Sequence, residues 1–140
     1  MTIREELKMK IEVAKIDNFL EINDIDLSID EINNILSELP YLTSLYLTDN
    51  KNSPFPEWIT QFTNLTHLYL NSYHLFELPE SLAKFTNLIY LDLSYNKFKI
   101  LPESIVNLHN LTYLDLSDNK LEELPKSIVN LTNLIYLGLD

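Results

Sequence analysis

The residues that could carry out chemistry in this chain are few and scattered. A metal site would need His67, His74 and His109, but these histidines do not share a metal-site spacing, and the chain has no cysteine to join them. No serine lies in a nucleophile-elbow motif, and the single glycine, Gly138, provides no phosphate-cradling loop. We therefore expect no catalytic residue, no cofactor and no metal, and we interpret the protein as a non-enzyme.

A 23-residue repeat organises the chain from residue 42 onwards. Each copy begins with the pattern L-x-x-L-x-L, in which the second and third leucines have the period of a strand with one buried face. One such strand buries too little surface alone, so we expect the strands to stack in parallel and merge their leucines into one core. The copies begin at Leu42, Leu65, Leu88, Leu111 and Leu134.

An asparagine and a proline at fixed offsets predict how the chain leaves each strand. The asparagine occurs at Asn50, Asn96 and Asn119, where its amide can satisfy backbone groups of the turn. Tyr73 takes its place in one copy. A proline then suits the start of a helical turn on the convex side. These prolines are Pro56, Pro79, Pro102 and Pro125.

The combined pattern L-P-x-x-I-x-x-L-x-x-L-x-x-L-x-L-x-x-N-x-L resembles the 23-residue class of leucine-rich repeats over residues 18–140. That class is found in Ras-suppressor and Scribble-like proteins, in bacterial repeat proteins and in the repeat regions of Roco GTPases. The resemblance implies an α/β solenoid with parallel strands on the concave face, short helices or turns on the convex face and an N-terminal helical cap. For function it implies only that the protein binds something.

Three segments follow from this interpretation. Residues 1–17 are expected to form an N-terminal capping helix, residues 18–41 a degenerate first repeat, and residues 42–140 four full repeats followed by a final strand. The cap would cover the apolar edge of the first strand, which a solenoid otherwise exposes. We favour this role over a partner-binding or membrane-anchoring helix because acidic residues are interspersed along the helix and its polar face is not basic.

Local signals mark the helices and the strand near the N-terminus. Thr2 and Glu5 have the spacing of a capping box. A strand is expected near residues 19–23, and Asp30 is the expected N-cap of a second helix that ends at Pro40. The expected apolar face of the first helix is Ile3, Leu7, Ile11 and Ala14.

Residues between the buried leucines should form columns on the concave face, about 4.8 Å apart. Tyrosine suits an interface because it offers a large area, few rotors and a hydroxyl. Asp92 and Asp115 should repel each other by roughly 1 kcal/mol even in water, and a basic ligand would relieve this. These aspartates also fit the repeat consensus, and stacked tyrosines stabilise a sheet without a partner. The predicted partner-binding residues are Tyr46, His67, Tyr69, Tyr90, Asp92, Tyr95, Tyr113, Asp115, Asp118 and Tyr136.

Charge and composition narrow the partner class. The net charge of −11 disfavours nucleic acid and anionic membranes, whose phosphates repel the chain, and favours a protein partner, particularly a basic one. No stretch approaches the roughly 18 apolar residues of a membrane span. The absence of cysteine and of a signal-peptide pattern at the N-terminus predicts a cytoplasmic protein.

Three functional hypotheses remain open. The preferred one is a protein–protein interaction module that binds its partner on the concave face. The second is the N-terminal repeat region of a larger signalling protein, such as a Roco GTPase, cut at Asp140. The third is a structural repeat protein that self-associates through its C-terminal edge, where we expect Leu137 and Leu139 to lie on an uncapped strand.

Overall fold

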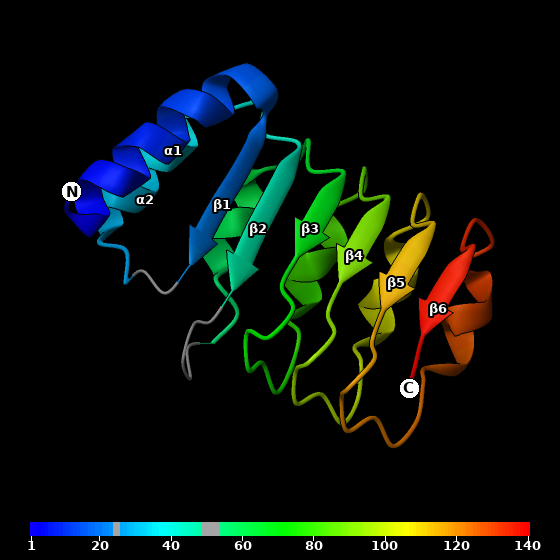
Figure 1. Ribbon diagram of the computed structural model, residues 1–140. Helices are drawn as coiled ribbons and strands as arrows, with labels where there is room; N and C mark the ends of the chain where they lie inside the picture. Colours follow the sequence, from blue (N-terminus) through cyan, green and yellow to red (C-terminus); the bar gives the residue numbers. More distant parts are fainter. Residues whose placement is uncertain (24–25, 49–53) are drawn as a thin grey trace.

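The computed structural model describes residues 1–23, 26–48 and 54–140. Within these residues, six strands form one parallel sheet in the order of the sequence (Figure 1). This confirms the predicted α/β solenoid of stacked parallel strands. The strands are β1 (Phe19–Asn23), β2 (Ser44–Thr48), β3 (His67–Tyr69), β4 (Tyr90–Asp92), β5 (Tyr113–Asp115) and β6 (Tyr136–Gly138).

Leucines aligned across the sheet form the core. The strand register pairs Leu45 with Leu68, Leu68 with Leu91, and Leu91 with Leu114, and all four side chains are fully buried. Residues on either side of each leucine are only partly buried, because successive side chains of a strand point to opposite faces. The period-two pattern therefore fixes which residues reach the concave face.

Short 3-10 helices close each repeat on the convex side, as Figure 1 shows. Each follows directly after one of the four prolines predicted to begin it, and its last turn is closed by a backbone hydrogen bond such as that from the N–H of Phe85 to the carbonyl of Leu82. Ile59, Leu82 and Ile105 point inward from these helices and are fully buried. The helices are η1 (Glu57–Gln61), η2 (Glu80–Lys84), η3 (Glu103–Asn107) and η4 (Lys126–Asn130).

The repeat asparagines bond to the backbone of two successive turns. The Nδ2 of Asn96 donates to the carbonyls of Leu70 and Leu93, each at 2.9 Å, and its Oδ1 accepts from the N–H of Leu75 at 2.9 Å. Asn119 makes the equivalent bonds one repeat later. The predicted turn role is thus confirmed for both residues, whereas Asn50 lies outside the described residues.

Two helices lie together at the N-terminal end of the sheet: α1 (Ile3–Asp17) and α2 (Ile29–Glu38) (Figure 1). Leu7, Ile11 and Ala14 of α1 are buried, as expected for a cap. Ile3, predicted for the same face, is 60% exposed because it lies in the first turn, at the outer end of the helix. No helix in the described part of the chain is long and apolar enough to cross a bilayer.

Side-chain caps begin both helices. Thr2 and Glu5 form the predicted capping box of α1. For α2 the expectation of Asp30 as N-cap is wrong: Ser28 is the cap, and it forms a capping box with Glu31. Ser28 has the extended backbone of an N-cap, which leaves Asp30 inside the first turn, where its carboxylate faces the positive end of the helix dipole.

Candidate functional site on the concave face

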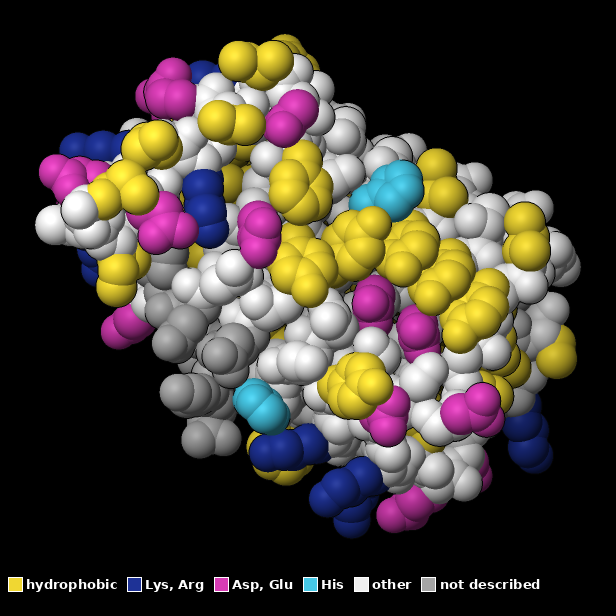
Figure 2. Space-filling view, viewed as in Figure 1, with side chains coloured by type: hydrophobic (Ala, Val, Ile, Leu, Met, Phe, Trp, Pro, Cys, Tyr) yellow, Lys and Arg dark blue, Asp and Glu magenta, His cyan; other side chains and the backbone are white. Residues whose placement is uncertain are grey.

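Two columns of side chains run across the concave face. The strand register aligns the residues before the central leucine as one column and those after it as a second. Figure 2 shows a band of yellow side chains across the strands, with acidic side chains in magenta beside it. The first column is Phe19, Ser44, His67, Tyr90, Tyr113 and Tyr136, and the second is Glu21, Tyr46, Tyr69, Asp92, Asp115 and Gly138.

His67, Tyr90, Tyr113 and Tyr136 form a stacked series that we call the aromatic ladder. The ring centroids of Tyr90 and Tyr113 are 4.1 Å apart at an interplanar angle of 6°, and those of Tyr113 and Tyr136 are 4.3 Å apart at 9°. The ring of His67 stacks on Tyr90 at 5.7 Å. Because the inner ring faces pack against one another, the ladder offers a ligand mainly ring edges and hydroxyl groups.

Tyr90 is the junction of the aromatic residues. A second series of rings passes from Tyr46 to Tyr69 with centroids 5.3 Å apart, and from Tyr69 to Tyr90 at 4.9 Å. Tyr90 therefore contacts His67, Tyr69 and Tyr113. The structure brings the aromatic residues predicted on the five strands β2–β6 into one connected surface.

Three tyrosine hydroxyls of this surface, those of Tyr69, Tyr90 and Tyr113, are held in their protonated form. Burial raises the pKa of Tyr69, and the neighbouring carboxylate of Asp92 raises it further. Burial likewise raises the pKa of Tyr90 and of Tyr113. A neutral phenol both donates and accepts a hydrogen bond, so these groups can bond to the carbonyl and N–H groups of a peptide.

Asp92 and Asp115 are fixed by the serines that follow them. Oδ1 of Asp92 accepts from the N–H of Ser94 at 3.0 Å and from its hydroxyl at 2.6 Å. Asp115 accepts the same two bonds from Ser117, and its Oδ2 lies 3.4 Å from the hydroxyl of Tyr113. The two carboxylates thus bond to the repeat's own turns through Oδ1.

Tyr95 and Asp118 lie on the turns that follow β4 and β5. Both adopt left-handed backbone conformations, with φ of 55° and 54°. Tyr95 is 60% exposed, and the negative charge of Asp118 raises the pKa of the Tyr95 phenol. These two predicted residues therefore extend the acidic and aromatic character of the surface beyond the strands.

Gly138 makes room for Asp115 at the end of the second column. A Cβ atom there would meet the carboxylate of Asp115 and lie 2.8 Å from Oγ of Ser117 and 2.9 Å from the hydroxyl of Tyr136. A larger residue at this position would therefore displace neighbouring side chains, and the reason is their close approach rather than a positive φ.

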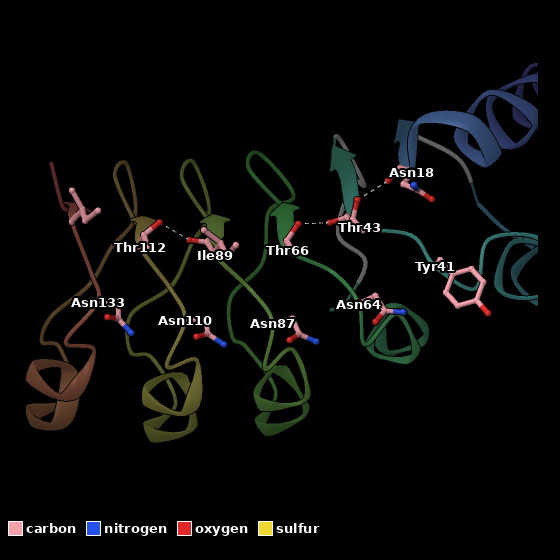
Figure 3. Close-up of a pocket in the computed structure, with 11 residues that line it drawn as sticks. Asn18, Tyr41, Thr43, Asn64, Thr66, Asn87, Ile89, Asn110, Thr112 and Asn133 are labelled. Carbon is pink, nitrogen blue, oxygen red and sulfur yellow. Dashed lines mark hydrogen bonds between the residues drawn. The ribbon is translucent and has the colours of Figure 1, made fainter.

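A hollow that the sequence did not predict follows the edge of the sheet at which the strands begin. It has a volume of about 1020 Å³ and runs along the loops that enter β2–β6, where Figure 3 shows a row of asparagine side chains. The amide of Asn110 donates to the carbonyl of Thr86, and that of Asn133 to His109. The signal in the sequence is the asparagine before the first leucine of four of the five copies, at Asn64, Asn87, Asn110 and Asn133.

Within the described residues, no three histidine, cysteine, aspartate or glutamate side chains gather into a group that could hold a metal ion. The residues that the structure brings together on the concave face are phenols, an imidazole and carboxylates already bonded to their own turns. Such an arrangement is suited to non-covalent binding.

Comparison with known proteins agrees with the stacked-strand geometry. Residues 77–140 match the family described as leucine-rich repeat region. An LRR protein of Leptospira interrogans is 37% identical to the chain, covers 83% of it and superposes with a TM-score of 0.71. The chain is a leucine-rich-repeat protein. No curated protein matches the sequence.

Two further solved structures show what similar solenoids are found with. The leucine-rich-repeat chain is 28% identical, over 86% of its length, to the plant peptide hormone receptor RGFR1 in complex with RGF2, with a TM-score of 0.62. It is 25% identical, again over 86%, to TLR13 in a complex with the RNA ssRNA13, with a TM-score of 0.72. The chain spans only 29%, 19% and 18% of the lengths of the bacterial, plant and TLR13 structures.

Proposed function

We propose that this leucine-rich-repeat chain is a protein-interaction module that holds a basic, extended segment of another protein across its concave face. The observation that carries the proposal is the connected surface of tyrosines, which begins at Tyr46 and continues to Tyr136 beside two fixed carboxylates. The peptide-hormone complex of a similar solenoid supports the choice of a peptide-like ligand.

The dimensions of the face suit a short extended peptide. Neighbouring strands lie about 4.8 Å apart, so β1 to β6 span about 24 Å, the length of about seven extended residues. Tyrosine hydroxyls on the ladder would donate to peptide carbonyls. The Oδ2 atoms of Asp92 and Asp115 would accept from lysine or arginine side chains, in charge-assisted hydrogen bonds.

Charge supports a basic protein over RNA as the partner. The net charge of −11 repels phosphates, and Asp92, Asp115 and Asp118 lie on or beside the proposed binding surface. The same negative charge attracts a basic segment and should increase the rate at which that segment associates. The larger-protein and self-association hypotheses stay predictions, as does the cytoplasmic location.

Fluorescence anisotropy with two labelled peptides tests the proposal. The first peptide alternates lysine and serine, and the second alternates glutamate and serine. We expect the lysine peptide to bind and the glutamate peptide not to bind. Asp92→Asn with Asp115→Asn should weaken lysine-peptide binding and flatten its salt dependence, because two of the attracting charges are lost. Tyr90→Ala with Tyr113→Ala should also weaken it while the far-UV spectrum stays native.

A matched variant controls for net charge. Glu80→Gln with Glu123→Gln removes two exposed carboxylates outside the strands and should leave the affinity close to that of the wild type. Equal weakening by both pairs of substitutions would show attraction by overall charge only, and would contradict a concave site. Binding of single-stranded RNA in preference to the lysine peptide would contradict the partner class.

A further inference from the structure

Helix α1 carries a second apolar stripe that the capping role does not use. Leu7, Ile11 and Ala14 face the sheet and are buried. Met9, Val13 and Ile16 follow the spacing of i, i+4 and i+7, which places them on another face of the same helix. Their exposed fractions are 59%, 55% and 84%. Exposed apolar residues in isolation are ordinary, but a stripe beside a hollow marks a binding surface.

Part of this stripe lines a groove between α1 and β1. The groove has a volume of about 310 Å³, at the lower end of the range of about 300–1,000 Å³ for ligand pockets, and accommodates one or two apolar side chains. Its apolar wall consists of Met1, Met9, Val13 and Phe19, and its polar rim of Glu6, Lys10, Asp17 and Glu21.

The groove continues directly into the concave face. Phe19 is the first member of the column that becomes the aromatic ladder, and Glu21 is the first member of the second column. A peptide that crosses the strands from β6 towards β1 therefore reaches the groove at its end. The groove and the ladder form one surface, apolar at one end and aromatic with carboxylates at the other.

The rim of the groove is acidic. Three carboxylates line it, those of Glu6, Asp17 and Glu21, and the ammonium of Lys10 is paired with Glu6 at 3.2 Å. Asp17 accepts a hydrogen bond from the backbone N–H of Phe19, and Glu21 accepts one from the side chain of Asn23. An apolar side chain flanked by basic residues complements this combination of an apolar floor and an acidic rim.

We propose that the groove between α1 and β1 binds an apolar anchor, such as leucine or phenylalanine, at one end of the same basic segment that lies across the concave face. This inference rests on the proposed function and adds a specificity pocket to it. The anchor side chain contacts Val13 and Phe19, and the basic residues beside it face Asp17 and Glu21. The pocket also fixes the direction in which the segment crosses the strands.

Anisotropy with a pair of lysine–serine peptides tests this inference, one of them ending in two leucines. The leucine-ended peptide should bind about tenfold more tightly, as burial of one leucine side chain implies. Met9→Gln with Val13→Gln should abolish that advantage and leave the affinity of the plain peptide unchanged. Ile16→Gln is the matched control, because Ile16 is exposed on the same helix but does not line the groove.

Methyl NMR spectra identify the contact. The methyl signals of Met9 and Val13 should shift with the leucine-ended peptide and not with the plain one. An advantage that survives in the Met9→Gln/Val13→Gln variant, or is absent from the wild type, overturns the groove as anchor site. Because the plain peptide alone reports on the concave face, its failure to bind would instead refute the proposed function.

Discussion

The ring contacts of the aromatic ladder predict a graded loss of stability along it. Tyr90 contacts three aromatic rings, Tyr113 two and Tyr136 one. Each aromatic pair is worth about 0.5–1.5 kcal/mol. The lower half of that range applies at a surface that is partly open to solvent. The pairs alone should therefore cost about 1.5–3 kcal/mol in Tyr90→Ala, about 1–2 kcal/mol in Tyr113→Ala and about 0.5–1 kcal/mol in Tyr136→Ala.

Urea denaturation monitored by circular dichroism measures these differences. All three variants also lose the β-propensity of tyrosine, up to about 1 kcal/mol, and this shared cost cancels when they are compared. Tyr41→Ala is the control: Tyr41 is 74% exposed, so its loss should stay within about 0.5 kcal/mol. Equal losses in Tyr90→Ala and Tyr136→Ala would refute the view that the rings stabilise the sheet by pairwise stacking.

Three further predictions concern the turns, the glycine and the capping box. Asn96→Ala should lower the free energy of unfolding by about 2–5 kcal/mol in urea, because several buried backbone groups lose their partner. Gly138→Ala should displace the carboxylate of Asp115, which would appear as a shift of its carboxyl carbon signal in NMR spectra together with weaker lysine-peptide binding. The pKa of Glu31 is lowered from 4.5, chiefly by the backbone hydrogen bond from Ser28, so its contribution to stability is present above pH 4.5 and lost as the pH falls below it. The melting temperatures of wild type and Glu31→Gln should therefore converge in acid; a constant difference between them would contradict this.

The sequence predicted the fold and the positions of the concave columns because both follow from spacing. A 23-residue period with leucines two apart leaves one register for stacked strands, and that register pairs Tyr90 with Tyr113 as expected. The same period predicted the asparagine bonds of the turns, which depend on one side chain reaching a neighbouring backbone. The division of the chain into three segments stays a prediction.

Features that depend on rotamers and helix rotation could not be predicted in this way. Spacing places tyrosines side by side but does not say that the rings of Tyr113 and Tyr136 lie within 9° of parallel. Asp30 was mistaken for the cap of α2 because Asp and Ser are both good N-caps, and only the capping box with Glu31 separates them. The groove beside Phe19 depends on how α1 is rotated about its axis against β1. Apolar residues lie on two faces of α1, so the sequence does not determine which face packs against the strand.

The hydrogen bonds that join neighbouring repeats also determine how the solenoid should respond to mechanical force. Asn110 and Asn133 each bond to a residue 24 positions earlier, so each repeat is fastened to the one before it. A force applied along the sheet axis acts on these inter-repeat hydrogen bonds in series, so the repeat with the weakest contacts should unfold first. Unfolding of one repeat frees 23 residues. Stretched out, they add about 70–80 Å to the length of the chain, after subtraction of the one strand spacing that the folded repeat occupied. In an optical trap the repeats from β2 to β6 should lengthen in equal steps of this size, because their strands are 23 residues apart.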